Sequence, residues 1–187
     1  MQTETTKQVH AVCAQNRRSK VTDLTLCGIF AAIICVFTMF IQIQIIPAEG
    51  GMVHLGNVPL FFAAAFFGKK VGAVAGGIGM MLSDLLTGWA IYAPLTLIVV
   101  ALMGLVFGLI VREKPSFLNL MAAVLAVLVI KVAGYYIGEV IMYQSFTVPV
   151  ASIPGNIIQI ITGAIIAVPL ILVTGTAVSH LIKNNKE

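Results

Sequence analysis

The sequence predicts an all-α membrane protein with six transmembrane helices in one bundle and both termini in the cytoplasm. Of its 187 residues, 59% are hydrophobic and only 10% are charged, whereas soluble domains carry about 25% charged residues. Several apolar runs also approach or exceed the roughly 20 residues that a helix needs to cross a bilayer. We expect a cytoplasmic tail over residues 1–22, a transmembrane domain over residues 23–182 and a second cytoplasmic tail over residues 183–187.

The distribution of basic residues sets the orientation. Six helices place both ends of the chain on one side of the membrane, and ten of the eleven lysines and arginines then fall on that side. They are Lys7, Arg17, Arg18, Lys20, Lys69, Lys70, Arg112, Lys114, Lys183 and Lys186. Cytoplasmic loops carry such an excess of positive charge. We therefore expect a multi-pass protein of the cell membrane, with the three base-free loops outside.

Prolines, glycines and lysines divide the first two thirds of the apolar sequence. Pro47 ends the first helix, Pro59 suits the first turn of the short second helix, and Lys69 and Lys70 close it. The segment Gly88–Ala93 forms a tight turn between the third and fourth helices. The six expected helices are Asp23–Ile46, Asn57–Gly68, Val71–Thr87, Pro94–Val111, Phe117–Tyr143 and Pro154–Ile182.

Charged and polar segments set the remaining boundaries. The fourth helix ends at Val111, because three charged residues follow it at positions 112–114. A polar loop over Gln144–Ile153 separates the last two helices. Pro169 lies inside the sixth helix and predicts a kink there.

Three charged side chains lie inside the apolar runs: Asp84, Lys131 and Glu139. Such groups are costly in lipid and mark a functional site by default. Lys131, Tyr135 and Glu139 share one helix face, because residues four and eight apart nearly superimpose along a helix. We expect these four residues to line a pocket that opens to the outside. The alternative is a structural ion pair between Lys131 and Asp84 or Glu139 that holds two helices together.

Aromatic residues lie near the outer ends of the same helices. Trp89, Tyr92 and Tyr143 are expected to stack on a planar ligand in this pocket. They fit equally well the belt of tryptophan and tyrosine that membrane proteins place at the two interfaces.

Polar residues of two further segments complete the candidate pocket. Glu49 and His54, in the loop after the first helix, are expected to contact ligand or to form part of a lid; otherwise they are solvated. Asn156 and Gln159 lie about one turn apart near the start of the last helix, where they contact ligand or hydrogen-bond between helices. Asn57 is expected to cap the second helix.

The sequence lacks the motifs of common enzyme classes. It has no Gly-Lys-Ser/Thr phosphate-binding loop, no nucleophile elbow and no His-Glu-x-x-His or Cys-x-x-Cys pattern. Its three cysteines have no metal-ligand spacing. We therefore expect no cofactor, and membrane orientation rather than nucleic acid accounts for the basic residues. Two alternatives remain: an intramembrane enzyme using Asp84, Glu139 and His54, and a purely structural membrane subunit.

Three motif elements gather between Val53 and Ile110. They are His54-Leu55-Gly56-Asn57, Asp84-Leu85-Leu86-Thr87-Gly88-Trp89-Ala90 and Pro94-Leu95-Thr96. This segment resembles the central signature of the S components of energy-coupling factor (ECF) vitamin transporters. It is similar to the hydroxymethylpyrimidine and pyridoxine subgroup, whose elements read His-Leu-Gly-Asp, Asp-Leu-x-x-Gly-Tyr-Ala and Pro-x-Thr; Asn57 and Trp89 are the departures. The resemblance covers nearly the whole chain and agrees with a six-helix bundle.

The resemblance implies a transport subunit that is not itself an enzyme. It would capture a small vitamin or precursor outside and reorient in the membrane when docked to a transmembrane coupling subunit and two cytoplasmic ATPases. Gly28 and Ala32, a loose match to an Ala-x-x-x-Ala element, would face the coupling subunit. Hydroxymethylpyrimidine or vitamin B6 is the favoured ligand, with Asp84 and Glu139 accepting hydrogen bonds and Lys131 donating them. Riboflavin and pantothenate are the alternative ligands.

Overall fold

The computed structural model describes residues 20–44, 52–111 and 115–184. Residues 1–19 and 185–187, which make up most of the two expected tails, lie outside the described residues. The described chain is built almost entirely of helices. Its elements are α2 (Lys20–Phe40), β1 (Gln42–Gln44), β2 (Met52–His54), α3 (Asn57–Phe67), α4 (Lys69–Leu86), α5 (Ala93–Val111), α6 (Phe117–Tyr143), the 3₁₀ helix η1 (Val148–Ser152) and α7 (Ile153–Asn184).

The expected membrane character is confirmed. Four stretches of the described residues are long and apolar enough to cross a bilayer: Lys20–Phe40, Ala93–Val111, Phe117–Tyr143 and Val148–Thr176. The two remaining helices are α3, which is apolar but has 11 residues, and α4, which has 18 residues and carries Lys69, Lys70 and Asp84. α7 continues through Pro169.

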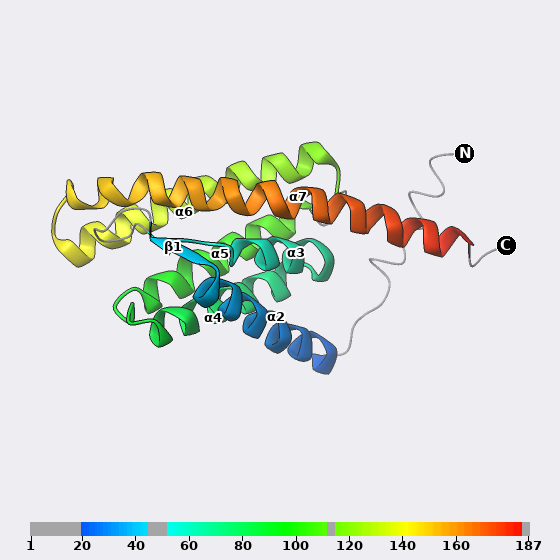
Figure 1. Ribbon diagram of the computed structural model, residues 1–187, viewed down its shortest axis with the longest axis horizontal. Coiled ribbons are helices and arrows are strands. Elements are labelled where there is room, and N and C mark those ends of the chain that lie inside the picture. The colour runs from blue at the N-terminus through cyan, green and yellow to red at the C-terminus, as the bar shows by residue number, and fades with distance from the viewer. Residues whose placement is uncertain (1–19, 45–51, 112–114, 185–187) are drawn as a thin grey trace.

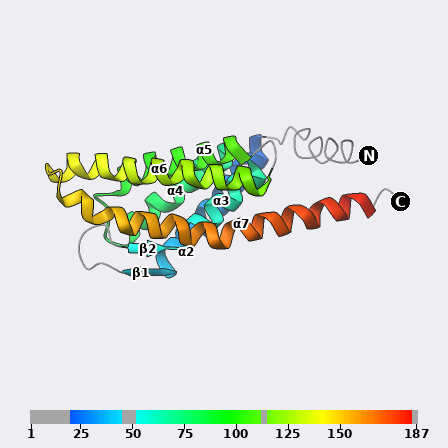
Figure 2. The ribbon, with the colours of Figure 1, turned by 90° about the horizontal axis from the view of Figure 1, so that it is seen from above.

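The helices form one elongated bundle (Figures 1 and 2). α6 and α7 pack side by side along its long axis, α4 contacts both α2 and α5, and α3 contacts α2, α4, α5 and α7. The start of α2 and the end of α7 lie toward the same end of the bundle, on the right in Figure 1. The β1–β2 hairpin, the α4–α5 turn and η1 lie toward the opposite end. The fold thus gathers three connections at one end.

The predicted first helix is wrong at its C-terminal end. α2 stops at Phe40 rather than Ile46, and Gln42–Gln44 pairs antiparallel with Met52–His54, with Ile43 opposite Val53. The reason is the alternation of isoleucine and glutamine from Ile41 onward, because a period of two with β-branched residues favours a strand. The expected loop also contains β2, and residues 45–51 lie outside the described part.

Close helix packing depends on glycines of α4 and α5. A methyl group added to Gly104 would overlap the backbone of Gly72, and one added to Gly79 would lie 2.6 Å from the carbonyl oxygen of Ala31. Side chains larger than hydrogen therefore cannot stand between these helices. In the same hydrophobic core, Phe61 of α3 and Phe107 of α5 stack with ring centroids 4.6 Å apart. Small residues on a membrane helix allow close approach of another helix, either within one chain or in a partner protein. In α4 they serve packing within the chain.

Substitution at the α4–α5 contact should destabilise the protein. We expect Gly104→Ala to lower the free energy of unfolding by about 1–3 kcal/mol, because the added methyl group forces two backbones apart. Gly175→Ala is the matched control, since nothing lies within 4 Å of its added methyl group and alanine favours a helix over glycine by roughly 0.5–1 kcal/mol. Thermal unfolding of the purified chain in detergent measures both. A Gly104→Ala melting temperature equal to that of the control contradicts the packing argument.

Candidate functional site

A polar cavity lies at the end of the bundle where the hairpin, the α4–α5 turn and η1 gather. Its volume is about 60 Å³, several times the roughly 10–15 Å³ that a single water needs on this measure. Five structural elements and one turn contribute its lining. The lining residues are His54, Asp84, Trp89, Tyr92, Thr96, Lys131, Tyr135, Glu139, Asn156 and Gln159.

The α4–α5 turn brings Asp84, Trp89 and Tyr92 to the cavity. The backbone N–H of Trp89 donates to the Asp84 carbonyl oxygen, and the N–H of Tyr92 donates to the Trp89 carbonyl oxygen, each at 2.9 Å. Gly88 has a φ of 88°, which glycine adopts without steric cost. The turn is therefore closed by its own backbone, and it brings Asp84 and Trp89 into the lining of the same cavity.

The face of α6 that carries Lys131, Tyr135 and Glu139 supplies the facing wall. Lys131 and Glu139 are each only 2% exposed. The Lys131 Nζ atom lies 5.1 Å from the centre of the Tyr135 ring, a cation–π contact. The Tyr135 hydroxyl is hydrogen-bonded to the Thr96 hydroxyl at 2.9 Å. This ties the α6 face to the first turn of α5.

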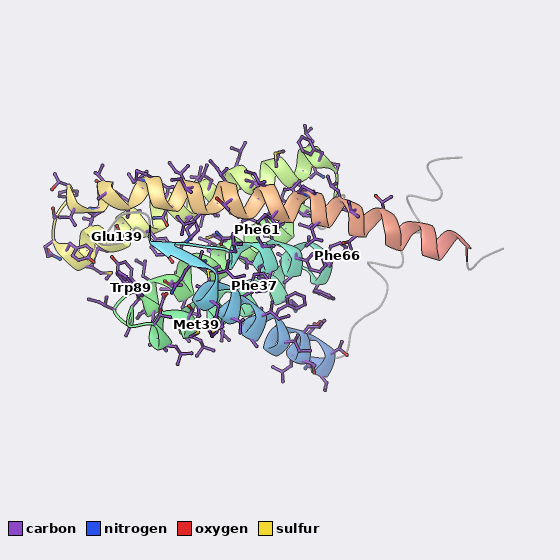
Figure 3. All side chains as sticks on the ribbon, viewed as in Figure 1. Phe37, Met39, Phe61, Phe66, Trp89 and Glu139 are labelled. Carbon is purple, nitrogen blue, oxygen red and sulfur yellow. The ribbon has the colours of Figure 1, made fainter. Side chains whose placement is uncertain are left out.

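Ser152 holds Glu139, the second acid of the cavity, in place. Ser152, at the end of η1, donates a hydrogen bond from Oγ to Glu139 Oε2 at 2.6 Å. The same hydroxyl lies 2.9 Å from the Pro149 carbonyl oxygen. The loop between α6 and α7 therefore fixes the Glu139 carboxyl group at the cavity wall. Figure 3 shows Glu139 and Trp89 toward this end of the bundle, with Phe66 toward the other.

His54 enters the cavity from β2, and its ring is fixed by the next turn of the chain. The backbone N–H of Gly56 donates to His54 Nδ1 at 3.2 Å. Burial lowers the pKa of His54 well below its ordinary value of 6.5, and the positive charge of Lys131 acts in the same direction. His54 is therefore neutral at neutral pH.

The electrostatic arrangement bears on the ion-pair alternative. Within the part of the chain that the structure describes, no ion pair shorter than 4.0 Å joins Lys131 to Asp84. Asp84 Oδ2 is buried and has no hydrogen-bond partner among the described residues. Unsatisfied buried oxygens are rare in folded proteins. Both charged groups line the same cavity, and no direct ion pair between them neutralises them there.

The structure brings together nine of the eleven residues singled out as candidate ligand contacts. Tyr143 does not line the cavity, and its hydroxyl is hydrogen-bonded to that of Tyr92 at 2.7 Å. Glu49 lies outside the described residues. The capping role expected of Asn57 is wrong: Gly56 occupies the cap position. Asn57 instead donates from Nδ2 to the Gln159 carbonyl oxygen at 3.3 Å, joining α3 to α7.

Sequence reasoning missed Thr96 and Ser152. Thr96 lies one turn after Tyr92, and its backbone N–H donates to the Tyr92 carbonyl oxygen at 2.8 Å, so the i, i+4 spacing was a usable signal. Ser152 gave no such signal, because its role depends on where η1 folds back onto α6. Among the described residues, no group of three histidine, cysteine, aspartate or glutamate side chains is placed to hold a metal ion.

The fold and the cavity together define a multi-pass helical membrane protein with a small polar cavity at one end of its bundle. Residues 18–175 match the family model described as the S component of the ECF-type riboflavin transporter. Because that match covers most of the chain, the chain belongs to the ECF-type S component family. The resemblance drawn from the motifs is thereby confirmed, and the chain is a vitamin-transport component with a small-molecule substrate and ECF transporter partners.

Two relatives extend the comparison. The chain is 30% identical over 158 residues to the thiamine precursor transporter HmpT of Lactococcus lactis subsp. cremoris (strain MG1363), covering 83% of this chain and 90% of that protein. It is 28% identical over 133 residues to an uncharacterized protein in the gap 3' region of Pyrococcus woesei, covering 71% of this chain and 88% of that protein.

The lowered pKa of His54 predicts a pH-dependent stability. As the pH falls through 6.5, the unfolded chain takes up a proton at this residue and the folded chain does not. We expect the free energy of unfolding to fall by up to about 1.4 kcal/mol per pH unit below that point, and to be independent of His54 above it. Thermal unfolding of wild type and His54→Gln between pH 5 and pH 8 measures the difference. A slope below pH 6.5 that is the same in both proteins contradicts the assignment.

Proposed function

We propose that this S component captures a thiamine precursor of the hydroxymethylpyrimidine class. The observation that carries the proposal is the cavity itself, in which Asp84 and Lys131 face a shared space with aromatic rings beside them. Asp84 accepts hydrogen bonds from a ring amine or hydroxyl group, and Lys131 donates to an acceptor. Trp89 and Tyr92 stack on the ring. The relative from L. lactis is a thiamine precursor transporter, which supports the same substrate class.

Size and charge both favour a single neutral ring. A cavity of about 60 Å³ suits one ring with short substituents better than the tricyclic ring and ribityl chain of riboflavin, the vitamin named in the family description. Two acids, Asp84 and Glu139, and one base, Lys131, line the cavity, so it has no excess positive charge to attract an anion such as pantothenate. A vitamin B6 pyridine has a similar size and hydroxymethyl groups, so it is the second candidate.

The proposed topology is six membrane crossings with cytoplasmic tails over residues 1–22 and 183–187. The excess of basic residues at one end of the bundle supports it, as do the start of α2 and the end of α7 at that same end. The cavity then opens outside. A reporter that is active only in the cytoplasm, fused after Glu187, should be active; an inactive but intact fusion argues against this topology.

The proposed partners are a transmembrane coupling subunit and two cytoplasmic ATPases, which hydrolyse ATP for the complex. Gly28 and Ala32 are exposed on α2, while Ala31 and Cys35 are buried against the bundle. Nothing lies within 4 Å of a methyl group added to Gly28. This small-residue face suits close approach of another membrane helix, and we assign it to the coupling subunit.

A panel of ligands tests the substrate class. We expect hydroxymethylpyrimidine to raise the melting temperature of the purified chain by several degrees, because a ligand at 100 times its Kd adds about 2.7 kcal/mol to the folded state. Pyridoxine should give a smaller shift, and riboflavin and pantothenate none. A shift with riboflavin alone would replace the proposed substrate, and no shift with any member would remove the capture role.

Cavity variants separate binding from folding. Asp84→Asn and Lys131→Met should each weaken hydroxymethylpyrimidine binding at least tenfold while the unliganded melting temperature changes little. Asp23→Asn and Lys70→Met are matched controls outside the cavity. If the two cavity variants fail to accumulate in the membrane, the structural ion-pair interpretation is favoured instead.

Larger side chains at Gly28 and Ala32 test the proposed docking face of α2. We expect Gly28→Leu and Ala32→Leu to reduce co-purification of the coupling subunit several-fold and to leave ligand binding unchanged, because a leucine holds the partner helix away. Ala122→Leu, at an exposed position on α6, is the matched control. Equal loss of the partner in the control, or full retention in both α2 variants, contradicts the assignment.

A further inference from the structure

His54 is held in one position by the backbone on both sides of it. It pairs with Gln42 across the β1–β2 hairpin, and the backbone N–H of Leu55 donates to the Ile41 carbonyl oxygen at 3.1 Å. The next amide, that of Gly56, points back at the imidazole and donates to Nδ1 at 3.2 Å. The ring is therefore set by main-chain contacts rather than by a movable side chain.

Gly56 permits this contact because it is pressed against the bundle. A methyl group added there would overlap the Thr38 hydroxyl and would lie 3.1 Å from both Met80 Cε and His54 Nδ1. Gly56 is itself buried, so its N–H has no water to bond and needs a protein acceptor. Only a bare ring nitrogen provides one, since the alternative ring orientation would present a carbon atom.

One ring nitrogen of a neutral imidazole carries the proton and the other accepts. Because Nδ1 accepts from Gly56, Nε2 carries the proton. The depressed pKa of His54, caused by burial and by the charge of Lys131, agrees with a neutral ring. Nε2 makes no hydrogen bond within the described part of the chain, and His54 lines the cavity.

We propose that His54 is a fixed hydrogen-bond donor of the cavity, with Gly56 as its positioning residue, and that Nε2–H recognises a bare acceptor atom on a neutral ring. This deepens the proposed function and rests on it for the identity of the ring. The ligand atom is an unprotonated ring nitrogen or a hydroxyl oxygen. A ring protonated at that atom, or carrying an N–H there, would meet a second donor and be rejected.

The tautomer is measurable without any ligand. The full chain labelled with ¹⁵N-histidine contains three histidines, and the signals of His54 are those absent from the His54→Gln variant. At pH 7 we expect a protonated Nε2 and a bare Nδ1. A protonated Nδ1, an imidazolium, or an exchanging mixture of the two tautomers would overturn the proposal whatever the chain transports.

Two variants test the donor role. Glutamine places a side-chain N–H close to the position of Nε2, whereas asparagine keeps an acceptor near Nδ1 but does not reach the cavity. For hydroxymethylpyrimidine we expect His54→Asn to raise the Kd at least tenfold and His54→Gln to raise it less than threefold. Equal losses of affinity in the two variants would overturn the donor role. If His54→Asn does not fold, a loss of affinity of tenfold or more in His54→Gln would overturn it.

Ligand titration separates this proposal from the proposed function. On addition of hydroxymethylpyrimidine, the Nε2 signal should shift while the Nδ1 signal stays. A Nδ1 shift with an unmoved Nε2 would overturn the donor role. If the wild-type chain binds no ring compound by thermal shift, the proposed function fails and so does the ligand half of this inference, while the ¹⁵N spectrum still decides the tautomer.

Discussion

Burying polar atoms among membrane helices is costly, because lipid offers no hydrogen bonds to replace those of water. In the described chain, the buried charged groups Asp84, Lys131 and Glu139 all reach one cavity. Some of the cost is offset inside the protein, as by the Ser152 hydrogen bond to Glu139. The Asp84 carboxylate is not fully compensated in this way, since Oδ2 has no described partner. The cavity is therefore built for a polar guest.

The way in which the helices pack makes this arrangement possible. Glycines at positions 72, 79 and 104 let α4 lie directly against α2 and α5. α4 is thereby held against both helices, and the acid near its C-terminal end enters the cavity rather than the lipid. The turn after it then returns two aromatic rings to the same space. Close packing on one side of the molecule and a polar site at its end are thus two consequences of the same small residues.

Much of the site was accessible from the sequence because helical spacing is regular. The positions of Lys131, Tyr135 and Glu139 share a face by periodicity alone, and buried charges in apolar runs are few enough to stand out. The hairpin was missed because three-residue strands give a short signal beside a long apolar run. Ser152 was missed because its contact depends on how a loop folds back in three dimensions. The family was inferred from the S-component motifs taken together, because no single residue identifies it.

The central claim is that a small neutral ring compensates the polar atoms of this cavity. Native mass spectrometry of the purified chain with hydroxymethylpyrimidine tests it most directly. We expect one bound ring per chain, retained by the Asp23→Asn and Lys70→Met proteins and lost when Asp84→Asn and Lys131→Met are combined. A wild-type chain that stays ligand-free, or a ring that remains bound to the combined cavity variant, would contradict it.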